Sequence, residues 1–332
     1  AEMTMYPNNP TENIMFMLTW PDVNTLFQGI YAEDKFKINE KTSIKLLGSI
    51  GFHRNKVESE LGLNSLQIFY PEIKAEKNRL LKSLALNYQY NQNNWELGAG
   101  LGYGERAPSV SEGYGFYLFN SFERYDYIGN PNLEKEESLE ANTFIGFKKE
   151  IFSAKISSSY FHISNYIIGK KILGLIPMTI GSNGVKMYSS IDYATIFNVD
   201  FITEIQILEN LKWNAQLGYN RGKDNHNENL PFMSPFSYKT SLSWDKNKFS
   251  SEISVIGNLK YKNFAEIYGE SETLAYTILN ASFGYKFTFD KHKILTRIGI
   301  ENTFDKFYTT YSDWNKIPKP GRNLFLNFNY LF

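Results

Sequence analysis

The last eleven residues, Arg322 to Phe332, alternate in a way that constrains the fold more than any other stretch. The even positions are all apolar: Leu324, Leu326, Phe328, Tyr330 and Phe332. The odd positions carry Asn323, Asn327 and Asn329, with Phe325 and Leu331 as exceptions. Successive residues of a strand point to opposite faces of a sheet, so this pattern predicts a strand with one apolar face. We expect a second sheet or lipid to cover that face.

The stretch from Trp95 to Gly104 alternates in the same way. Trp95, Leu97, Ala99, Leu101 and Tyr103 alternate with Glu96 and four glycines. An aromatic residue at each end and aliphatic residues between them are typical of a strand that crosses a membrane, with its rings at the two interfaces. The glycine face allows a bulky group to approach the backbone closely. Residues 212–220 and 236–244 repeat the aromatic-ended pattern.

The composition agrees with strands that are apolar on one face only. The chain has 26 Phe, 23 Tyr and 5 Trp in 332 residues, yet its mean hydropathy is −0.38. Lys plus Arg and Asp plus Glu both number 35, which gives no electrostatic case for a polyanionic partner such as nucleic acid. No cysteine is present, so disulfides and Cys-based zinc sites are excluded.

Short polar turns alternate with much longer connections along the chain. The expected turns are Asn91–Asn94, Lys148–Glu150, Glu209–Asn210, Asp245–Lys248 and Asp290–His292. The expected long loops are Val57–Ala75, Ala107–Glu136, Lys171–Gly184, Gly222–Met233, Asn263–Glu272 and Lys306–Pro320. Short turns at one end and long loops at the other indicate an outer-membrane barrel. A β-sandwich is the alternative, but the polar second faces argue against it, because a sandwich packs two apolar faces together.

About thirteen strands are expected from Asn24 onward. We interpret Ala1 to Asp22, which has no regular period and contains three prolines, as a loop segment. A one-residue slip of the apolar phase at Phe197–Val199 predicts a β-bulge. The predicted organisation is an external loop segment over residues 1–23 and barrel wall over residues 24–332.

Three stretches together resemble the C-terminal half of the barrel of TonB-dependent outer-membrane receptors. They are Gly104-Glu105-Arg106-Ala107-Pro108-Ser109-Val110-Ser111-Glu112, Gly129-Asn130-Pro131-Asn132-Leu133-Glu134-Lys135-Glu136-Glu137-Ser138, and the segment from Ile298 to Phe332 with Glu301-Asn302-Thr303-Phe304-Asp305-Lys306-Phe307-Tyr308 and Pro320-Gly321-Arg322. We expect the first two to be architectural. Gly129-Asn130-Pro131 would form a turn, and Arg106 and Glu112 would fix the loop by charge-assisted hydrogen bonds.

The resemblance implies an all-β, transmembrane antiparallel β-barrel of about 22 strands, of which this chain supplies about thirteen. The plug domain and roughly nine strands would then belong to a preceding, N-terminal part of the receptor. It also implies a location in the outer membrane of a Gram-negative bacterium, contact with outer-membrane lipid, and coupling to a TonB-type energy-transducing protein through that missing N-terminal part. The implied function is active uptake of a scarce nutrient, such as a siderophore or metal complex.

No catalytic motif is present, so we predict that the protein is not an enzyme and needs no cofactor. Copper or an iron complex would be a substrate. The four histidines, His53, His162, His226 and His292, lack the spacing of metal ligands. We place His53 on the inner face near the external end of its strand, where either ligand or solvent would contact it.

Two Met-x-Met pairs, Met3-Thr4-Met5 and Met15-Phe16-Met17, stand at the start of the chain. In extended backbone, residues i and i+2 point the same way, so two thioethers can converge on one ion. Thioethers are soft ligands that favour Cu(I). The alternatives are a copper site at Met3, Met5, Met15 and Met17, or methionines that pack with Phe16, Leu18 and Trp20. The resemblance includes a copper-receptor branch of the family.

The predicted loop from Tyr114 to Tyr127 is rich in aromatic residues. Rings at a receptor mouth can stack on a flat iron chelate or a sugar, or they can pack loop against loop. The candidate ligand-binding residues are His53, Tyr114, Phe116, Tyr117, Phe122, Arg124, Tyr125 and Tyr127. The functional alternatives to energy-coupled uptake are a copper-binding receptor that uses the methionine pairs, and a passive porin or surface-binding barrel.

Overall fold

A computed structural model describes residues 2–5, 15–290, 292–312 and 317–332, with residues 2–5 and 15–17 described by their backbone only. The strands are β1 (Glu2–Met5), β2 (Met15–Leu18), β3 (Val23–Lys37), β4 (Thr42–Val57), β5 (Glu76–Gln92), β6 (Trp95–Arg106), β7 (Leu118–Asn120), β8 (Tyr125–Ile128), β9 (Glu136–Lys149), β10 (Phe152–Ile172), β11 (Val185–Leu208), β12 (Leu211–Asp224), β13 (Ser237–Lys246), β14 (Phe249–Asn258), β15 (Tyr276–Phe289), β16 (His292–Glu301) and β17 (Asn323–Leu331). The helices are α1 (Glu60–Gln67), α2 (Val110–Tyr114) and the 3-10 turn η1 (Glu266–Tyr268). Among the described residues, no helix is long and apolar enough to cross a membrane.

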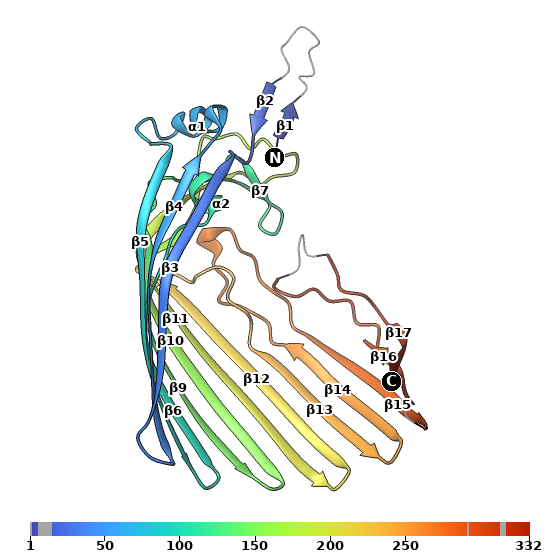
Figure 1. The fold of residues 1–332 in the computed structure, drawn as a ribbon. Coiled ribbons are helices and arrows are strands. Elements are labelled where there is room, and N and C mark those ends of the chain that lie inside the picture. The colour runs from blue at the N-terminus through green and yellow to red at the C-terminus, as the bar shows by residue number, and fades with distance from the viewer. Residues whose placement is uncertain (1, 6–14, 291, 313–316) are drawn as a thin grey trace.

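One large sheet dominates the structure, and Figure 1 shows it as a curved wall of long neighbouring strands. Its main path is β17-β16-β15-β14-β13-β12-β11-β10-β9-β6-β5-β4-β3, all antiparallel, which confirms the expectation of about thirteen strands. The short strands β7 and β8 extend it to fifteen, and β8 pairs in parallel with β11. The sheet is open, with β3 and β17 at its two edges.

The two faces of the sheet differ as the alternation predicts. On β17, Leu324, Leu326 and Phe328 are exposed on one face, and on β6 Trp95 and Leu101 are exposed likewise. We call this the apolar face. The opposite, polar face carries residues such as Asn323, Asn327 and Arg297. Exposed aliphatic rows of this kind need an apolar surrounding, because hydrocarbon surface is unfavourable in water.

Turn lengths set the two ends of the sheet apart. Short turns join β3 to β4, β5 to β6, β9 to β10, β11 to β12, β13 to β14 and β15 to β16 at one end, which is the lower end in Figure 1. The long connections and all the helices lie at the other end, which we call the loop end. The predicted turns and loops therefore fall where expected. Lys291, within the predicted turn Asp290–His292, and residues 313–316, within the predicted loop Lys306–Pro320, lie outside the described residues.

Side chains from neighbouring strands fill part of the glycine face of β6. The ring of Phe144, the direct cross-strand partner of Gly98, would lie within 2.1 Å of a Cβ at Gly98. The amide groups of Asn87 and Asn142 occupy the corresponding space at Gly100. Towards the loop end, at Gly104, nothing lies within 4 Å. The close approach that the glycines allow is thus made within the sheet, by an aromatic residue that covers a glycine across the strands.

Two details differ from the sequence prediction. The expected bulge at Phe197–Val199 is wrong: β11 keeps its register with β10 and β12 there, and the shift falls between Gln206 and Leu208. Ile196 lies on the polar face of β11, where it packs against a buried cluster under the loops. This packing explains why an apolar residue occurs on that face. The segment predicted as a loop, Ala1 to Asp22, contains the β1–β2 hairpin as a separate two-stranded sheet. Ala1 and residues 6–14 of that segment lie outside the described residues.

Candidate functional site

Most side chains that could bind a ligand or take part in chemistry lie at the loop end. The first sequence motif, Gly104 to Glu112, forms its framework. Arg106, the last residue of β6, donates from both Nη atoms to Glu112 at 2.8 and 3.0 Å and from Nε to Glu136 at 2.7 Å. Glu112 also closes a capping box with Ser109 at the start of α2. The predicted Arg106–Glu112 interaction is therefore confirmed. Glu136 extends the network by accepting from the backbone N–H of Ile167 on β10.

This network changes the proton affinity of Glu112. Burial disfavours the charged form of Glu112, but hydrogen bonds and charge from Arg106, together with the Ser109 backbone, outweigh that cost. They hold the pKa of Glu112 below its ordinary value of 4.5. The arrangement is a fixed ion network, which suits an architectural role and gives no proton donor or acceptor for chemistry.

The second motif packs directly against the first. The backbone N–H of Gly129 donates to the carbonyl of Gly115, and that of Asn130 donates to the carbonyl of Glu112. A Cβ at Gly129 would lie 2.6 Å from the backbone nitrogen of Tyr114. The predicted turn at Gly129-Asn130-Pro131 thus exists, and it needs glycine because two backbones meet there.

Most of the predicted ligand-binding rings lie inside the protein. Tyr114, Phe116 and Tyr117 belong to a buried cluster with Val57, Leu66, Ile73, Ile128 and Val185. Tyr125 and Tyr127, on β8, are also buried. These five side chains hold the loops together in this conformation and leave little surface for a ligand.

Phe122 and Arg124 stay accessible at the tip between β7 and β8. The ring of Phe122 lies 5.4 Å from that of Phe232, which comes from the β12–β13 loop. Arg124 is exposed and donates from Nη2 to the carbonyl of Gly181 at 3.0 Å. Phe232 was not among the predicted ligand residues. Its partner, Phe122, is more than a hundred positions away in the sequence, and only the folded loops bring the two rings together.

A buried ion pair lies beneath this tip. Lys186 Nζ donates to Glu123 at 2.6 Å, and the Lys186 side chain is 1 % exposed. The Tyr127 hydroxyl contacts both groups, and Lys186 Nζ lies 4.7 Å from the centre of the Tyr125 ring. Burial lowers the pKa of Lys186 against the opposing effect of Glu123, and burial raises the pKa of Glu123. No local pattern marks either residue in the sequence.

His53 lies apart from these residues, on the polar face of β4. Its cross-strand partner on β5 is Arg79. Arg79 is buried and donates to the side chain of Asn55 and to the carbonyl of Leu133. The predicted ligand residue His53 thus lies beside a buried polar group that contacts the β6–β9 connection.

The β1–β2 hairpin brings the four predicted methionines into register. Met3 is paired with Met17 and Met5 with Met15. Directly opposed residues of an antiparallel pair share a face, and so do residues i and i+2 of one strand. All four methionine positions therefore fall on one face of the hairpin. From the sequence alone, only the two methionines within each Met-x-Met pair could be expected to share a face.

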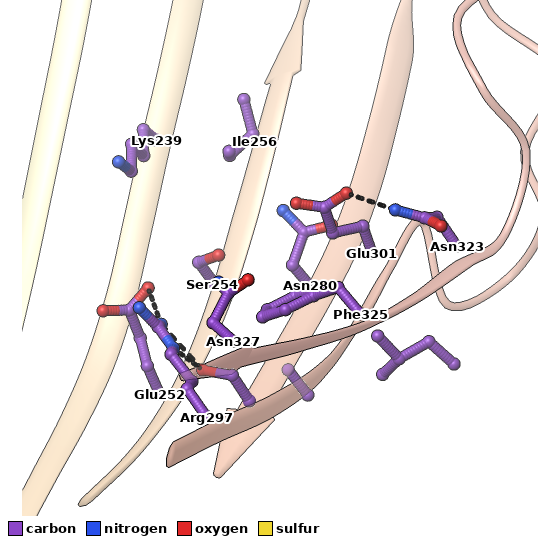
Figure 2. Close-up of a pocket in the computed structure, with 13 residues that line it drawn as sticks. Lys239, Glu252, Ser254, Ile256, Asn280, Arg297, Glu301, Asn323, Phe325 and Asn327 are labelled. Carbon is purple, nitrogen blue, oxygen red and sulfur yellow. Dashed lines mark hydrogen bonds and ion pairs between the residues drawn. The ribbon is translucent and has the colours of Figure 1, made fainter. Parts of the chain in front are cut away.

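The polar face of the sheet near β17 lines a cavity of about 510 Å³. Figure 2 shows side chains of β13 to β17 lining it. Arg297 donates to the Ser282 hydroxyl and lies 3.7 Å from Glu252, while Asn323 donates to Glu301 at 3.1 Å. Asn280 and Asn327 add further amides to the lining. This wall is lined mainly by polar and charged side chains, as expected for the inside of a barrel.

The described residues contain no group of three or more His, Asp or Glu side chains arranged to hold a metal ion. Oxygen and imidazole donors therefore give no metal centre in that part of the chain.

Comparisons with known proteins agree with this architecture. The fold is similar to that of the copper transporter OprC, with a TM-score of 0.78 at 17% identity over 92% of this chain and 48% of that one. A mutant of the ferric enterobactin receptor PfeA from Pseudomonas aeruginosa matches with a TM-score of 0.64 at 13% identity, over 93% of this chain and 54% of that one. The FrpB iron transporter from Neisseria meningitidis gives 0.62 at 16% identity, over 93% and 44%.

The chain thus spans about half the length of these solved structures, and their low identities establish the fold alone. No protein with a curated function matches the sequence. Residues 4–302 match the family described as TonB dependent receptor-like, beta-barrel, whose members are receptors and transporters of the outer membrane. Since this match covers most of the sequence, the chain belongs to the TonB-dependent receptor β-barrel family.

Proposed function

We propose that the chain forms the C-terminal part of the barrel wall, over residues 24–332, of a receptor that actively imports a scarce nutrient through the outer membrane of a Gram-negative bacterium. The single observation that carries this is the combination of an apolar sheet face, a polar face and one loop end in a member of this family. Lipid would cover the apolar face, and a TonB-type protein would supply energy through the N-terminal part of the receptor.

Energy coupling distinguishes this proposal from a passive porin. The test is uptake of iron-55 chelates and copper-64 by cells that carry the complete receptor, with and without TonB. We expect uptake that requires both the receptor and TonB. Receptor-dependent uptake that continues unchanged without TonB supports a passive pore and contradicts the proposal.

Copper is a second candidate substrate, and the register of the hairpin favours it. Four thioether positions on one face match the preference of Cu(I) for soft ligands. The similarity of the fold to the copper transporter OprC supports this choice. Iron chelates are supported by the similarity to ferric enterobactin and iron transporters.

A titration of the purified receptor with Cu(I) tests the methionine site. The Met3→Leu/Met5→Leu variant removes two of the four thioethers while keeping apolar side chains of similar size. We expect the variant to lose high-affinity Cu(I) binding. Met178→Leu is the matched control, because Met178 packs against the buried cluster of the loop end. Equal Cu(I) affinity in the wild type and the Met3/Met5 variant would rule out the hairpin as the copper site.

A further inference from the structure

The apolar face has a groove of about 360 Å³ near the end of the sheet that carries the short turns. Ala154 on β10 lies at its centre. The cross-strand partner of Ala154 on β9 is Phe147, and its neighbours on the same face of β10 are Phe152 and Ile156. One methyl group among larger side chains leaves the hollow. The apolar residues that line it are Trp95, Ile145, Phe147, Phe152, Ala154, Ile156 and Phe201.

Three rings along this groove contact one another. The Trp95 and Phe147 ring centres lie 4.8 Å apart, and those of Phe147 and Phe152 lie 6.0 Å apart. Such contacts favour one arrangement of the rings, which keeps the groove open beside Ala154. A narrow apolar groove of this kind suits a linear hydrocarbon chain.

A cation and a carboxylate stand where the groove meets the β9–β10 turn. Lys149 is the direct cross-strand partner of Phe152, so the two side chains share the apolar face. Glu150 follows Lys149 in the turn. Both charged residues are exposed, and among the described residues neither lies within ion-pair distance of an opposite charge.

The other charges of this region are paired or lie on the polar face. Lys155 also borders the groove, but its Nζ lies over the Phe144 ring and 4.0 Å from Glu96, on the polar face. Lys212 pairs with Glu204 at 3.4 Å. The unpaired residues are Lys148, which lies on the polar face opposite Ser153, Lys149, Glu150, and Glu209 in the β11–β12 turn. Their charges sum to zero, so a zwitterionic headgroup matches this region better than an anionic one.

We propose that the groove binds one acyl chain of a phosphatidylethanolamine molecule, with the lipid phosphate on Lys149 and the lipid ammonium on Glu150. The proposal rests on the proposed function, which places the short turns on the periplasmic side and the groove in the inner leaflet, where the lipids are phospholipids.

The two charged residues supply the selectivity of this site. Hydrocarbon contact selects no particular lipid, because all lipid tails are similarly apolar. Phosphatidylethanolamine completes a charge-assisted hydrogen bond at each charged residue. The ammonium of phosphatidylcholine has no N–H to donate to Glu150, and phosphatidylglycerol has no cation at all.

Native mass spectrometry of the complete, delipidated receptor tests the site with these three lipids, all carrying the same acyl chains. We expect one phosphatidylethanolamine to bind roughly 3- to 10-fold more tightly than either other lipid. Lys149→Gln and Glu150→Gln should each abolish this preference. Ala154→Leu fills the groove and should weaken binding of phosphatidylethanolamine by a similar factor.

Two matched controls should bind like the wild type. Ala99→Leu makes the same change on the apolar face of β6, outside the groove. Lys246→Gln removes a lysine that also lies opposite a phenylalanine, Phe249, beside a short turn, but that turn carries Asn247 and Lys248 instead of a carboxylate.

Equal affinity of the wild type for the three lipids would overturn the proposal. So would an unchanged preference in Lys149→Gln or unchanged binding in Ala154→Leu. Lipid-free dimers that Ala154→Leu dissociates would assign the groove to a second copy of the chain instead. TonB-dependent uptake is scored separately in cells, so its failure would contradict the proposed function alone.

Discussion

Gly129 and Lys186 each hold long connections of the loop end in place. Gly129 sits where the returning connection meets the backbone of α2, and no side chain fits there. Lys186 joins β11 to the tip between β7 and β8 through a buried charge. Both act together with the buried aromatic cluster to hold these long connections in one conformation.

Replacing Gly129 with alanine should destabilise the loop end. The new Cβ would meet backbone atoms that cannot turn away, at 2.6 to 2.8 Å, so we expect a loss of about 1–3 kcal/mol in the free energy of unfolding. Gly113→Ala is the control, because nothing lies within 4 Å of a Cβ there. Denaturant unfolding of both variants measures the difference. Equal destabilisation by the two substitutions would contradict the packing described for Gly129.

Removing one member of the Lys186–Glu123 pair should cost more than removing both. Lys186→Met leaves Glu123 buried without its partner, for which we expect a loss of about 3–5 kcal/mol. The Lys186→Met/Glu123→Gln double variant should lose less than Lys186→Met alone. A double-mutant cycle on unfolding free energies measures the coupling. Strictly additive losses would show that the two side chains do not interact.

At the scale of elements, the short helix α2 depends on the ionised form of Glu112. The pKa of Glu112 is lower in the folded protein than in the unfolded chain, so the stabilisation of the fold by ionised Glu112 is complete above about pH 4.5. It is lost as the pH falls through the folded-state value. We therefore expect amide exchange in residues 109–115, corrected for its intrinsic pH dependence, to accelerate on acidification. In Glu112→Gln this extra acceleration should disappear. Persistence of the full effect in that variant would assign it to another group.

Strands with a long run of alternating apolar and polar residues were predictable from the sequence. β6 and β17 show many successive alternations, and the long connections follow from the distances between such stretches. The four-residue strands β1 and β2 contain too few alternations to distinguish from a loop. The parallel pairing of β8 with β11, and the contact between Phe122 and Phe232, join distant parts of the chain. Such contacts depend on how the loops pack together, which no local pattern encodes.

For the whole molecule, we propose that lipid covers the apolar face of the sheet and that the polar face lines the inside of a barrel. Outward side chains of β17 remain exposed in the structure, among them Leu324, Leu326 and Phe328. A charge in the lipid layer is costly, by about 2–4 kcal/mol for arginine near the midplane.

Substitution by arginine at neighbouring positions of β17 should therefore give opposite results. Leu326→Arg, on the apolar face, should reduce the yield of receptor folded into lipid vesicles. Asn327→Arg, on the polar face, should leave the yield close to that of the wild type, because that face is already lined by charged and amide groups. A gel shift between folded and heat-unfolded receptor measures both yields. Equal yields, or a larger loss in Asn327→Arg, would contradict the assignment of the faces.

The most direct measurement is the accessibility of spin labels placed one at a time at positions 324 to 330 of the complete receptor in outer-membrane lipid. Oxygen dissolves in the hydrocarbon layer, so it should broaden the signals at positions 324, 326, 328 and 330. At 325, 327 and 329, on the face towards the barrel interior, its effect should be weak. We predict this alternation of oxygen access, with a period of two. Strong oxygen access at the odd positions, or equal access throughout, would show that lipid does not cover the apolar face.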